Sequence, residues 1–149
     1  MKQKINTFYI LNLLSIVDGE ILESVHVDIS KYIYLDISTA EGQNVIINDL
    51  LKPQLLHFSL ENQEKIRISM LYCIENYDER KLESILNFYS GSVFLTPNDN
   101  ITYKQVFEIF YIGVFLKNIN NEELNNFIFF EDDNLECWNL FNKQMWLEF

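Results

Sequence analysis

The chain has 149 residues, 48% of them hydrophobic, with four glycines and two prolines. This length and composition suit a single folded domain spanning residues 1–149 and exclude an intrinsically disordered chain. The net charge of −11, from 22 acidic and 11 basic residues, argues against nonspecific binding to nucleic acid or to an anionic membrane, and it favours association with basic surfaces.

The first elements that the sequence predicts are β-strands. Asp18-Gly19 suits a two-residue hairpin turn, because both residue types tolerate positive φ. The register set by this turn places most of the flanking apolar side chains on one face. Apolar and polar residues also alternate over residues 33–37, which predicts a third strand. We therefore expect an antiparallel β-hairpin or a three-strand meander in a β-rich region over residues 5–37.

A helical region, residues 43–149, is predicted to follow. Residues 43–58 are ambiguous between helix and strand, and Pro53 limits either element. Beyond them the apolar residues recur with the helical period, and Ser59 is suited to cap the first clear helix. The expected helices are 60–77, 79–89, about 103–117, a short one from Asn121 with Leu124, Phe127 and Ile128 on one face, and a last one carrying Leu135, Trp138, Phe141 and Met145.

The predicted fold class is therefore α+β: the hairpin or meander, with about five helices packed on its apolar face. A mainly α fold is the alternative. Residues 109–116, IFYIGVFL, are apolar on every side of their predicted helix. Such a helix is either wrapped by neighbours in the core or covered by another chain, so a homodimer through this helix is an alternative to burial within the domain.

Catalytic and metal-binding motifs are missing from the sequence. His26 and His57 have no histidine or cysteine at i+3 or i+4, and no phosphate-binding glycine loop or nucleophile elbow occurs. Cys73 and Cys137 lie far apart without a metal-binding motif, which is typical of a reducing compartment. We expect no catalytic residue, metal or cofactor, no enzymatic activity, and a cytoplasmic location. The apolar start also has the profile of a secretory signal, although polar residues interrupt it.

The most distinctive stretch is FFEDDNLECW, residues 129–138, in which acids stand between aromatic side chains. Asp133 and Glu136 have the spacing of a helix capping box, which explains those two acids without a partner. The other acids of the tail are left unexplained, and together with an aromatic anchor they would attract and hold a basic protein. The candidate partner-binding residues are Glu122, Glu123, Glu131, Asp132, Asp133, Glu136 and Trp138.

A second acidic segment, residues 18–41, offers a rival surface. On the predicted hairpin its acids would border a strand edge that could pair with a partner sheet. The acids of this rival surface are Glu20, Glu23, Asp28 and Asp36.

Taken over the whole chain, this profile resembles the small acidic immunity proteins of bacterial toxin–immunity systems, including contact-dependent inhibition and polymorphic-toxin loci. The resemblance lies in size, acidity, aromatic content, a composition typical of AT-rich coding, and the lack of catalytic motifs. It implies a cytoplasmic inhibitor that neutralises a cognate, basic toxin domain by electrostatic and steric occlusion, without binding nucleic acid or membrane itself. An acidic secretion chaperone or adaptor, and a phage DNA-mimic inhibitor, are the alternatives.

Overall fold

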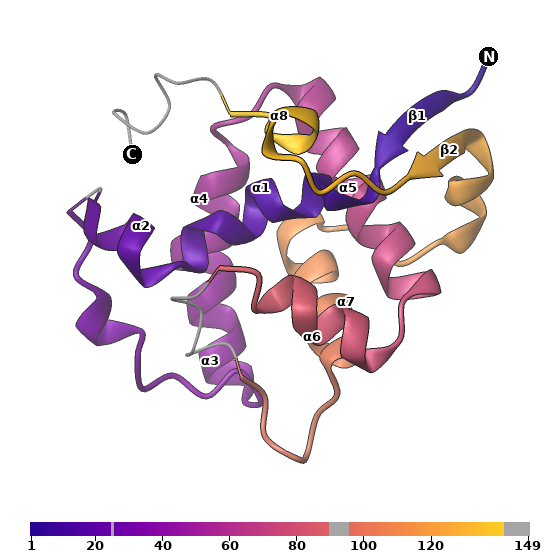
Figure 1. Ribbon diagram of the computed structural model, residues 1–149. Helices are drawn as coiled ribbons and strands as arrows, with labels where there is room; N and C mark the ends of the chain where they lie inside the picture. The colour runs from indigo at the N-terminus through magenta and orange to yellow at the C-terminus, as the bar shows by residue number, and fades with distance from the viewer. Residues whose placement is uncertain (25, 90–95, 142–149) are drawn as a thin grey trace.

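The computed structural model describes residues 1–24, 26–89 and 96–141, and in them the chain is mostly helical around one core (Figure 1). Two short strands form the sheet of this described part. The α-helices and strands, in chain order, are β1 Gln3–Asn6, α1 Ile10–Leu14, α2 Gly19–Ser24, α3 Ala40–Val45, α4 Lys52–Leu55, α5 Leu60–Asn76, α6 Glu79–Leu86, α7 Tyr103–Phe115, β2 Phe127–Phe130 and α8 Leu135–Trp138. Short segments of 3₁₀-helix or π-helix join several of them: η1 Thr7–Tyr9, η2 Ser15–Val17, η3 Ile29–Lys31, η4 Ile46–Leu51 and η6 Asn121–Asn126.

The predicted α+β fold with an antiparallel hairpin is wrong. Residues 7–17 form the helical turns η1, α1 and η2, and Asp18 precedes helix α2, where its carbonyl accepts the first-turn hydrogen bond from Leu22 at 3.0 Å. The predicted polar face of the hairpin included Leu11 and Leu13, and both are fully buried. A segment buried on all sides has no polar face, so its apolar pattern fits a helix as well as a strand.

The predicted third strand is also wrong. Residues 32–39 form turns, in which the Asp36 carboxylate accepts a hydrogen bond from Ser38 N at 2.9 Å. Thr39 then caps α3 through the backbone N–H of Gly42. Short polar side chains that bond to nearby backbone groups stabilise such turns in competition with strand pairing.

The ambiguous segment over residues 43–58 is helical, running through α3, the π-helical segment η4 and α4. Pro53 lies in the first turn of α4, where a missing backbone N–H costs no hydrogen bond. The predicted helices 60–77, 79–89 and 103–117 are present as α5, α6 and α7, and Ser59 caps α5 as expected.

The core is built around α1 and η2, whose apolar side chains are buried from Ile10 to Val17. Helix α5 crosses this segment, and its Ser69 hydroxyl accepts a hydrogen bond from Ile10 N and donates one to the carbonyl of Thr7. Helix α7 packs on α5, and one of its sides is buried while the other is exposed. Phe107, Phe110 and Tyr111 are buried. Ile112 and Leu116, on the outer side, are exposed.

The predicted element at residues 121–128 is only partly helical. A 3₁₀ segment, η6, covers Asn121–Asn126, and Phe127 begins strand β2 instead of completing a helical face. β2 pairs in parallel with β1, in the register Gln3 with Phe127 and Asn6 with Phe130. The two strands lie side by side at one corner of the molecule, next to the N-terminus (Figure 1).

The last predicted helix is shortened to α8. Its cap is Asn134, which accepts a hydrogen bond from Glu136 N at 3.0 Å, so the predicted Asp133 capping box is wrong. Phe141 lies beyond the helix, and Met145 lies outside the described residues.

Candidate functional site at the C-terminal acidic surface

We call the surface formed by η6, β2 and α8, residues 121–138, the C-terminal surface. Its centre is β2, one face of which lies on α5. Phe129 stacks on Tyr72 of α5 with ring centroids 4.2 Å apart, and Phe127 lines a small hollow together with residues of α5. Successive strand residues point to opposite faces, so Ile128 and Phe130 point away from the helix. They are 46% and 39% exposed.

Two buried asparagines attach this surface to the start of the chain. Asn6 donates to the carbonyl of Asp132 at 2.9 Å and accepts from the backbone N–H of Asp132 at 3.3 Å. Asn12 donates to the carbonyl of Trp138 at 2.8 Å and accepts from Leu140 N at 2.8 Å. Each asparagine side chain therefore makes the hydrogen bonds that a neighbouring strand would otherwise make with the extended backbone before and after α8.

Glu123, one of the predicted partner-binding acids, is used inside the protein. It forms a two-point ion pair with Arg67 of α5, a side chain that is only 4% exposed. Arg67 also donates to Glu64 and to the hydroxyl of Tyr111, at 2.9 Å and 2.8 Å. The five N–H groups of the guanidinium are all used, so this cluster ties η6, α5 and α7 together.

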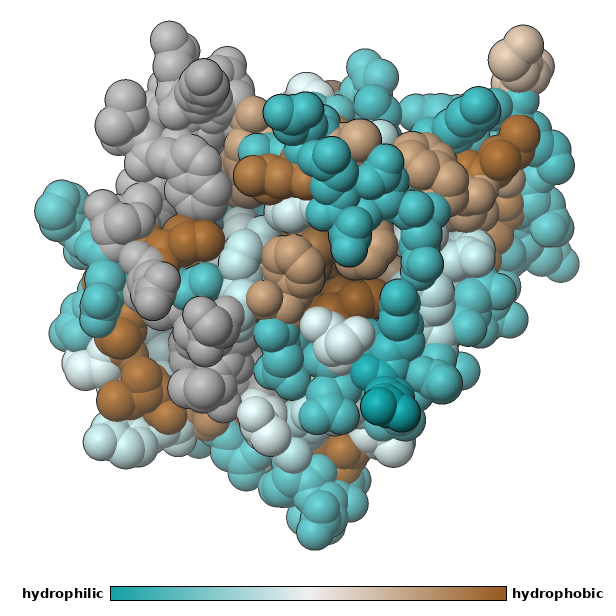
Figure 2. All heavy atoms as spheres, viewed as in Figure 1, coloured by the Kyte–Doolittle hydropathy of each residue, from teal (hydrophilic) through white to brown (hydrophobic). Residues whose placement is uncertain are grey.

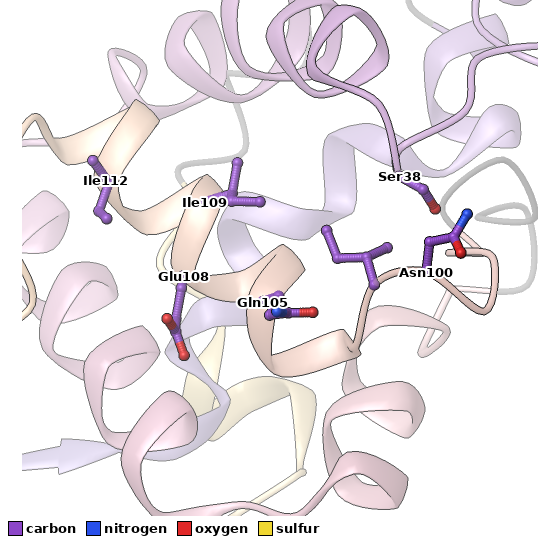
Figure 3. Close-up of a pocket in the computed structure, with 7 residues that line it drawn as sticks. Ser38, Asn100, Gln105, Glu108, Ile109 and Ile112 are labelled. Atoms are coloured by element: carbon purple, nitrogen blue, oxygen red, sulfur yellow. The ribbon is translucent and has the colours of Figure 1, made fainter.

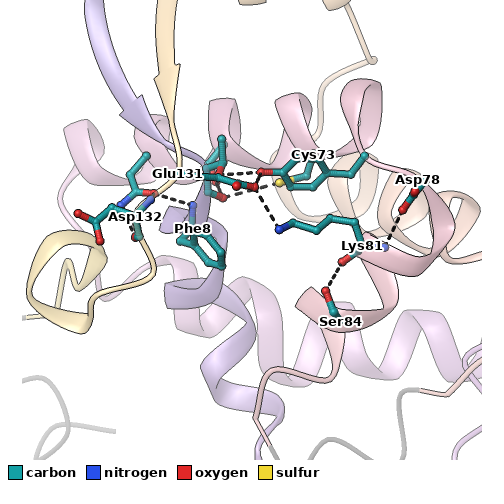
Figure 4. A network of polar contacts seen from close by, with 11 residues as sticks. Phe8, Cys73, Asp78, Lys81, Ser84, Glu131 and Asp132 are labelled. Atoms are coloured by element: carbon teal, nitrogen blue, oxygen red, sulfur yellow. Dashed lines mark hydrogen bonds and ion pairs between the residues drawn. The ribbon is translucent and has the colours of Figure 1, made fainter.

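Glu131 is also tied to the body of the protein (Figure 4). Its carboxylate accepts a hydrogen bond from Tyr77 and lies 3.2 Å from the Lys81 ammonium. These two donors hold the pKa of Glu131 below its ordinary value, the hydrogen bond from Tyr77 being the larger cause. Burial and the same hydrogen bond raise the pKa of Tyr77. The Lys81 ammonium also lies over the rings of Phe8 and Tyr77.

Asp132 and Trp138 have structural contacts as well. The carboxylate of Asp132 accepts from Asn134 N at 3.0 Å, closing the turn before α8. Trp138 is 3% exposed, and its indole N–H donates to the carbonyl of Asp133 at 3.0 Å. The indole is therefore part of the core and is not presented to a partner in this conformation.

Three of the predicted acids remain free on the surface. Glu122, Asp133 and Glu136 are exposed, and within the described ranges no cation or hydrogen-bond donor contacts their side chains. Glu122 precedes β2, and the other two follow it. Free acids thus lie five residues before the strand and three and six residues after it in sequence. The sequence-based list of seven residues separates into three free acids, three structural acids and one buried tryptophan.

The rival acidic segment is more dispersed. Asp28 accepts from Ser30 N in the turn of η3, and Asp36 holds the turn before α3. Glu23 is exposed, and the side chain of Glu20 lies outside the described part. Because the described residues of this segment form no strand, they do not supply the expected strand edge for a partner sheet.

Hollows also lie elsewhere on the described surface, and two of them border α7. One, of about 390 Å³, lies beside α7 (Figure 3). Its polar lining includes Ser38, Asn100, Gln105 and a single carboxylate, Glu108. In the parts of the chain that the structure covers, no cluster of three histidine, cysteine or acidic side chains is placed to hold a metal ion.

The second hollow, of about 440 Å³, is a groove between the α4–α5 junction and the end of α7. We call it the leucine groove. Leu56 and Leu60 at its rim are 77% and 83% exposed, and Leu116, beside the groove at the end of α7, is 76% exposed. Lys117 and Glu64 supply charges of both signs at its edge.

Comparisons with known proteins found no relative of the chain. No family model matches the chain, and neither the search of curated proteins nor that of solved structures found a match. Over the described residues, no helix combines the length and apolar character needed to span a membrane.

Sequence reasoning missed the residues that hold this surface in place. Asn6, Asn12, Arg67, Tyr77 and Lys81 all act across long sequence separations, and local periodicity carries no information about such contacts. The one signal available was the polarity of Asn6 and Asn12 within an apolar run, since buried polar side chains are normally hydrogen-bonded.

Proposed function

We propose that the protein is a cytoplasmic, immunity-type inhibitor that binds a basic protein domain, and that it acts by occupying that domain's surface and not by catalysis. The observation that supports this proposal is the arrangement around β2: two exposed apolar side chains in the strand, with Glu122 on one side and Asp133 and Glu136 on the other. Exposed apolar contacts bordered by uncompensated charge are typical of protein-binding surfaces.

The chemistry of this surface favours a basic partner. Free carboxylates attract lysine and arginine side chains at long range and raise the association rate, while the apolar side chains between them supply contact once water is excluded. For a toxin that acts on nucleic acid, the same carboxylates would occupy the positions that bind phosphate groups. Cys73 and Cys137 do not pair in a disulfide, which is consistent with a cytoplasmic location.

The test is a binding and rescue experiment. The tagged protein is used to capture candidate basic domains encoded beside its gene, and each captured domain is then co-expressed with it to measure rescue of growth. The triple variant Glu122→Gln, Asp133→Asn, Glu136→Gln is expected to bind about tenfold or more weakly and to rescue poorly. Its matched control, Glu41→Gln, Glu83→Gln, Asp99→Asn, removes the same charge from exposed acids elsewhere.

The two triple variants distinguish an effect of the C-terminal surface on binding from an effect of the protein's net charge. Loss of binding in the first triple variant alone supports the proposal, and raising the salt concentration should weaken the wild-type complex. Equal loss in both variants, or capture of a basic domain without growth rescue, would contradict it.

A second candidate function is an acidic secretion chaperone or adaptor that acts as a homodimer. The leucine groove favours it, because Leu56, Leu60 and Leu116 expose apolar area next to the outer side of α7. A second copy would cover this area through a two-fold interface. Sedimentation of the wild type as a dimer, and of Leu60→Lys as a monomer, would support this candidate over the first.

A further inference from the structure

The outer edge of β2 is short, with four residues, but it carries no charge, proline or bulge that would keep it from pairing. Exposed edges are commonly protected by an inward charge, a proline or a bulge. The strand itself reads Phe-Ile-Phe-Phe, residues 127–130, four residues of high strand propensity without a charge or a proline. Acids stand at both ends of the strand but not within it.

The hydrogen bonding of β2 leaves one edge open. On one side it pairs with β1 in parallel register. Apart from that ladder, residues 127–130 form one backbone hydrogen bond to the described chain. It runs from the N–H of Phe127, which caps the end of η6, to the carbonyl of Leu124. In the described ranges no further strand, side chain or loop donates to or accepts from the outer edge of β2.

The strand that already pairs with the other edge of β2 is basic. β1 is short and extended, and it carries the positive charge of this region in Lys4, next to Lys2. In the ladder Lys4 lies beside Ile128, so its ammonium is on the same face as the exposed apolar side chain. Figure 2 shows hydrophobic side chains over this corner, bordered by hydrophilic ones.

We propose that the free edge of β2 binds an extended, basic segment of the partner by strand addition, so that the two-stranded ladder becomes three-stranded. Backbone hydrogen bonds supply affinity in this binding mode, and alternate side chains supply specificity. Lysine or arginine side chains of the added strand would approach the acids at both ends, while its apolar side chains would cover Ile128 and Phe130. Like charges at those ends disfavour the pairing of two β2 strands from two copies.

This inference rests on the proposed function for the basic character of the partner, but its test uses defined peptides. The probe is a short synthetic peptide of alternating valine and lysine, titrated into the full-length protein by calorimetry. One matched peptide has glutamate in place of lysine, and another has alternate backbone amides N-methylated. The unmodified lysine peptide is expected to bind, and each matched peptide about tenfold or more weakly, because it loses either charge complementarity or edge hydrogen bonds.

A variant of β2 tests whether the peptide binds at this strand edge. Ile128→Lys introduces the kind of charge that protects natural edges and should weaken binding of the lysine peptide about tenfold. Leu60→Lys makes the same change at an exposed leucine of the leucine groove and should bind like the wild type. The peptide comparison does not depend on either variant folding.

The outcomes separate this inference from the proposed function. Absence of binding by any peptide, equal binding by the N-methylated peptide, or a dimer abolished by Ile128→Lys would overturn strand addition. Capture of a basic domain that the lysine peptide does not displace would also overturn it, while leaving the inhibitor role intact. Peptide binding without capture of any basic domain would support the edge and contradict the inhibitor role.

Discussion

Glu123 and Arg67 face each other in a two-point ion pair, with Nη1 to Oε2 at 2.9 Å and Nη2 to Oε1 at 3.0 Å. The neighbouring Glu122 is exposed and has no such contact within the described residues. Two adjacent acids of one 3₁₀ turn therefore differ completely in what they do: one attaches the turn to α5, and the other is available to a partner.

The first prediction concerns this pair of acids. Glu123→Gln should lower the free energy of unfolding by about 1–2 kcal/mol, because the buried guanidinium loses one of its two carboxylates while keeping Glu64. Glu122→Gln should change it by less than about 0.5 kcal/mol. Urea denaturation of both variants measures the difference, and equal effects would show that the ion pair contributes no stability.

The second prediction concerns Asn12, which is buried and joined to the backbone at Trp138 and Leu140. Asn12→Ala should cost about 2–3 kcal/mol, because a carbonyl and an N–H group are left without partners. Asn76→Ala, which removes an exposed amide bonded within its own helix, is the control and should cost less than about 0.5 kcal/mol. Thermal melts compare them, and a small effect at Asn12 would mean that water replaces its bonds.

The third prediction compares two helical glycines. A Cβ on Gly42 would lie 2.1 Å from the carbonyl oxygen of Asp36, whereas one on Gly113 would lie 2.6 Å from Cδ1 of Ile47. A backbone carbonyl cannot move without its turn, but a terminal methyl can rotate away. Gly42→Ala should therefore destabilise by about 2 kcal/mol or more, and Gly113→Ala by less than about 1 kcal/mol after the gain in helix propensity.

Shortening the side chain of Ile47, the neighbour of Gly113, provides the control for the comparison of the two glycines. Ile47→Val should reduce the cost of Gly113→Ala in the double variant, since it removes the methyl group that the new Cβ meets. Similar costs for the two single glycine variants would contradict the distinction between rigid and movable neighbours.

The fourth prediction is a pH dependence at Glu131. Its pKa is held below the ordinary value by the Tyr77 hydrogen bond and by Lys81. The stabilisation is therefore fully present above the unfolded-state pKa of about 4.3 and is lost as the pH falls through the lower folded-state pKa. Glu131→Gln should remove that part of the acid sensitivity and lower stability at neutral pH.

Acid titrations of stability test this prediction. The exposed Glu136, which has no partner in the described part of the chain, supplies the control, and Glu136→Gln should follow the wild-type curve. If the Glu131→Gln curve is parallel to that of the wild type, the network around Tyr77 contributes nothing to acid sensitivity.

The helices from residue 59 to 115 could be predicted because local signals agree there. Ser59 and the apolar period of α5 coincide, and Asp78 precedes α6 as its cap. The N-terminal third could not be predicted from the same signals, since Asp18-Gly19 suits a hairpin turn and also the start of a helix. The decisive fact was burial of residues 10–17 on every side, and burial is a property of the whole fold.

The candidate site was predictable in composition but not in geometry. The sequence placed acids and aromatics together at residues 129–138, and the structure leaves Phe130, Asp133 and Glu136 of this stretch exposed. It also buries Trp138 and engages Glu123 and Glu131 with Arg67, Tyr77 and Lys81. These contacts depend on which helices meet in space, so no local pattern could separate the free acids from the structural ones.

The two asparagine attachments have a consequence for the order of folding. Asn6 and Asn12 bond to groups 126 residues away in sequence, and β1 completes its ladder with a strand near the other end of the described chain. Contacts of such long separation form late, because loop-closure entropy opposes them until most of the chain is ordered. On the ribosome, the N-terminal segment is therefore synthesised long before its partners emerge. The C-terminal surface around β2 should be assembled in the last step of folding, after the helical core.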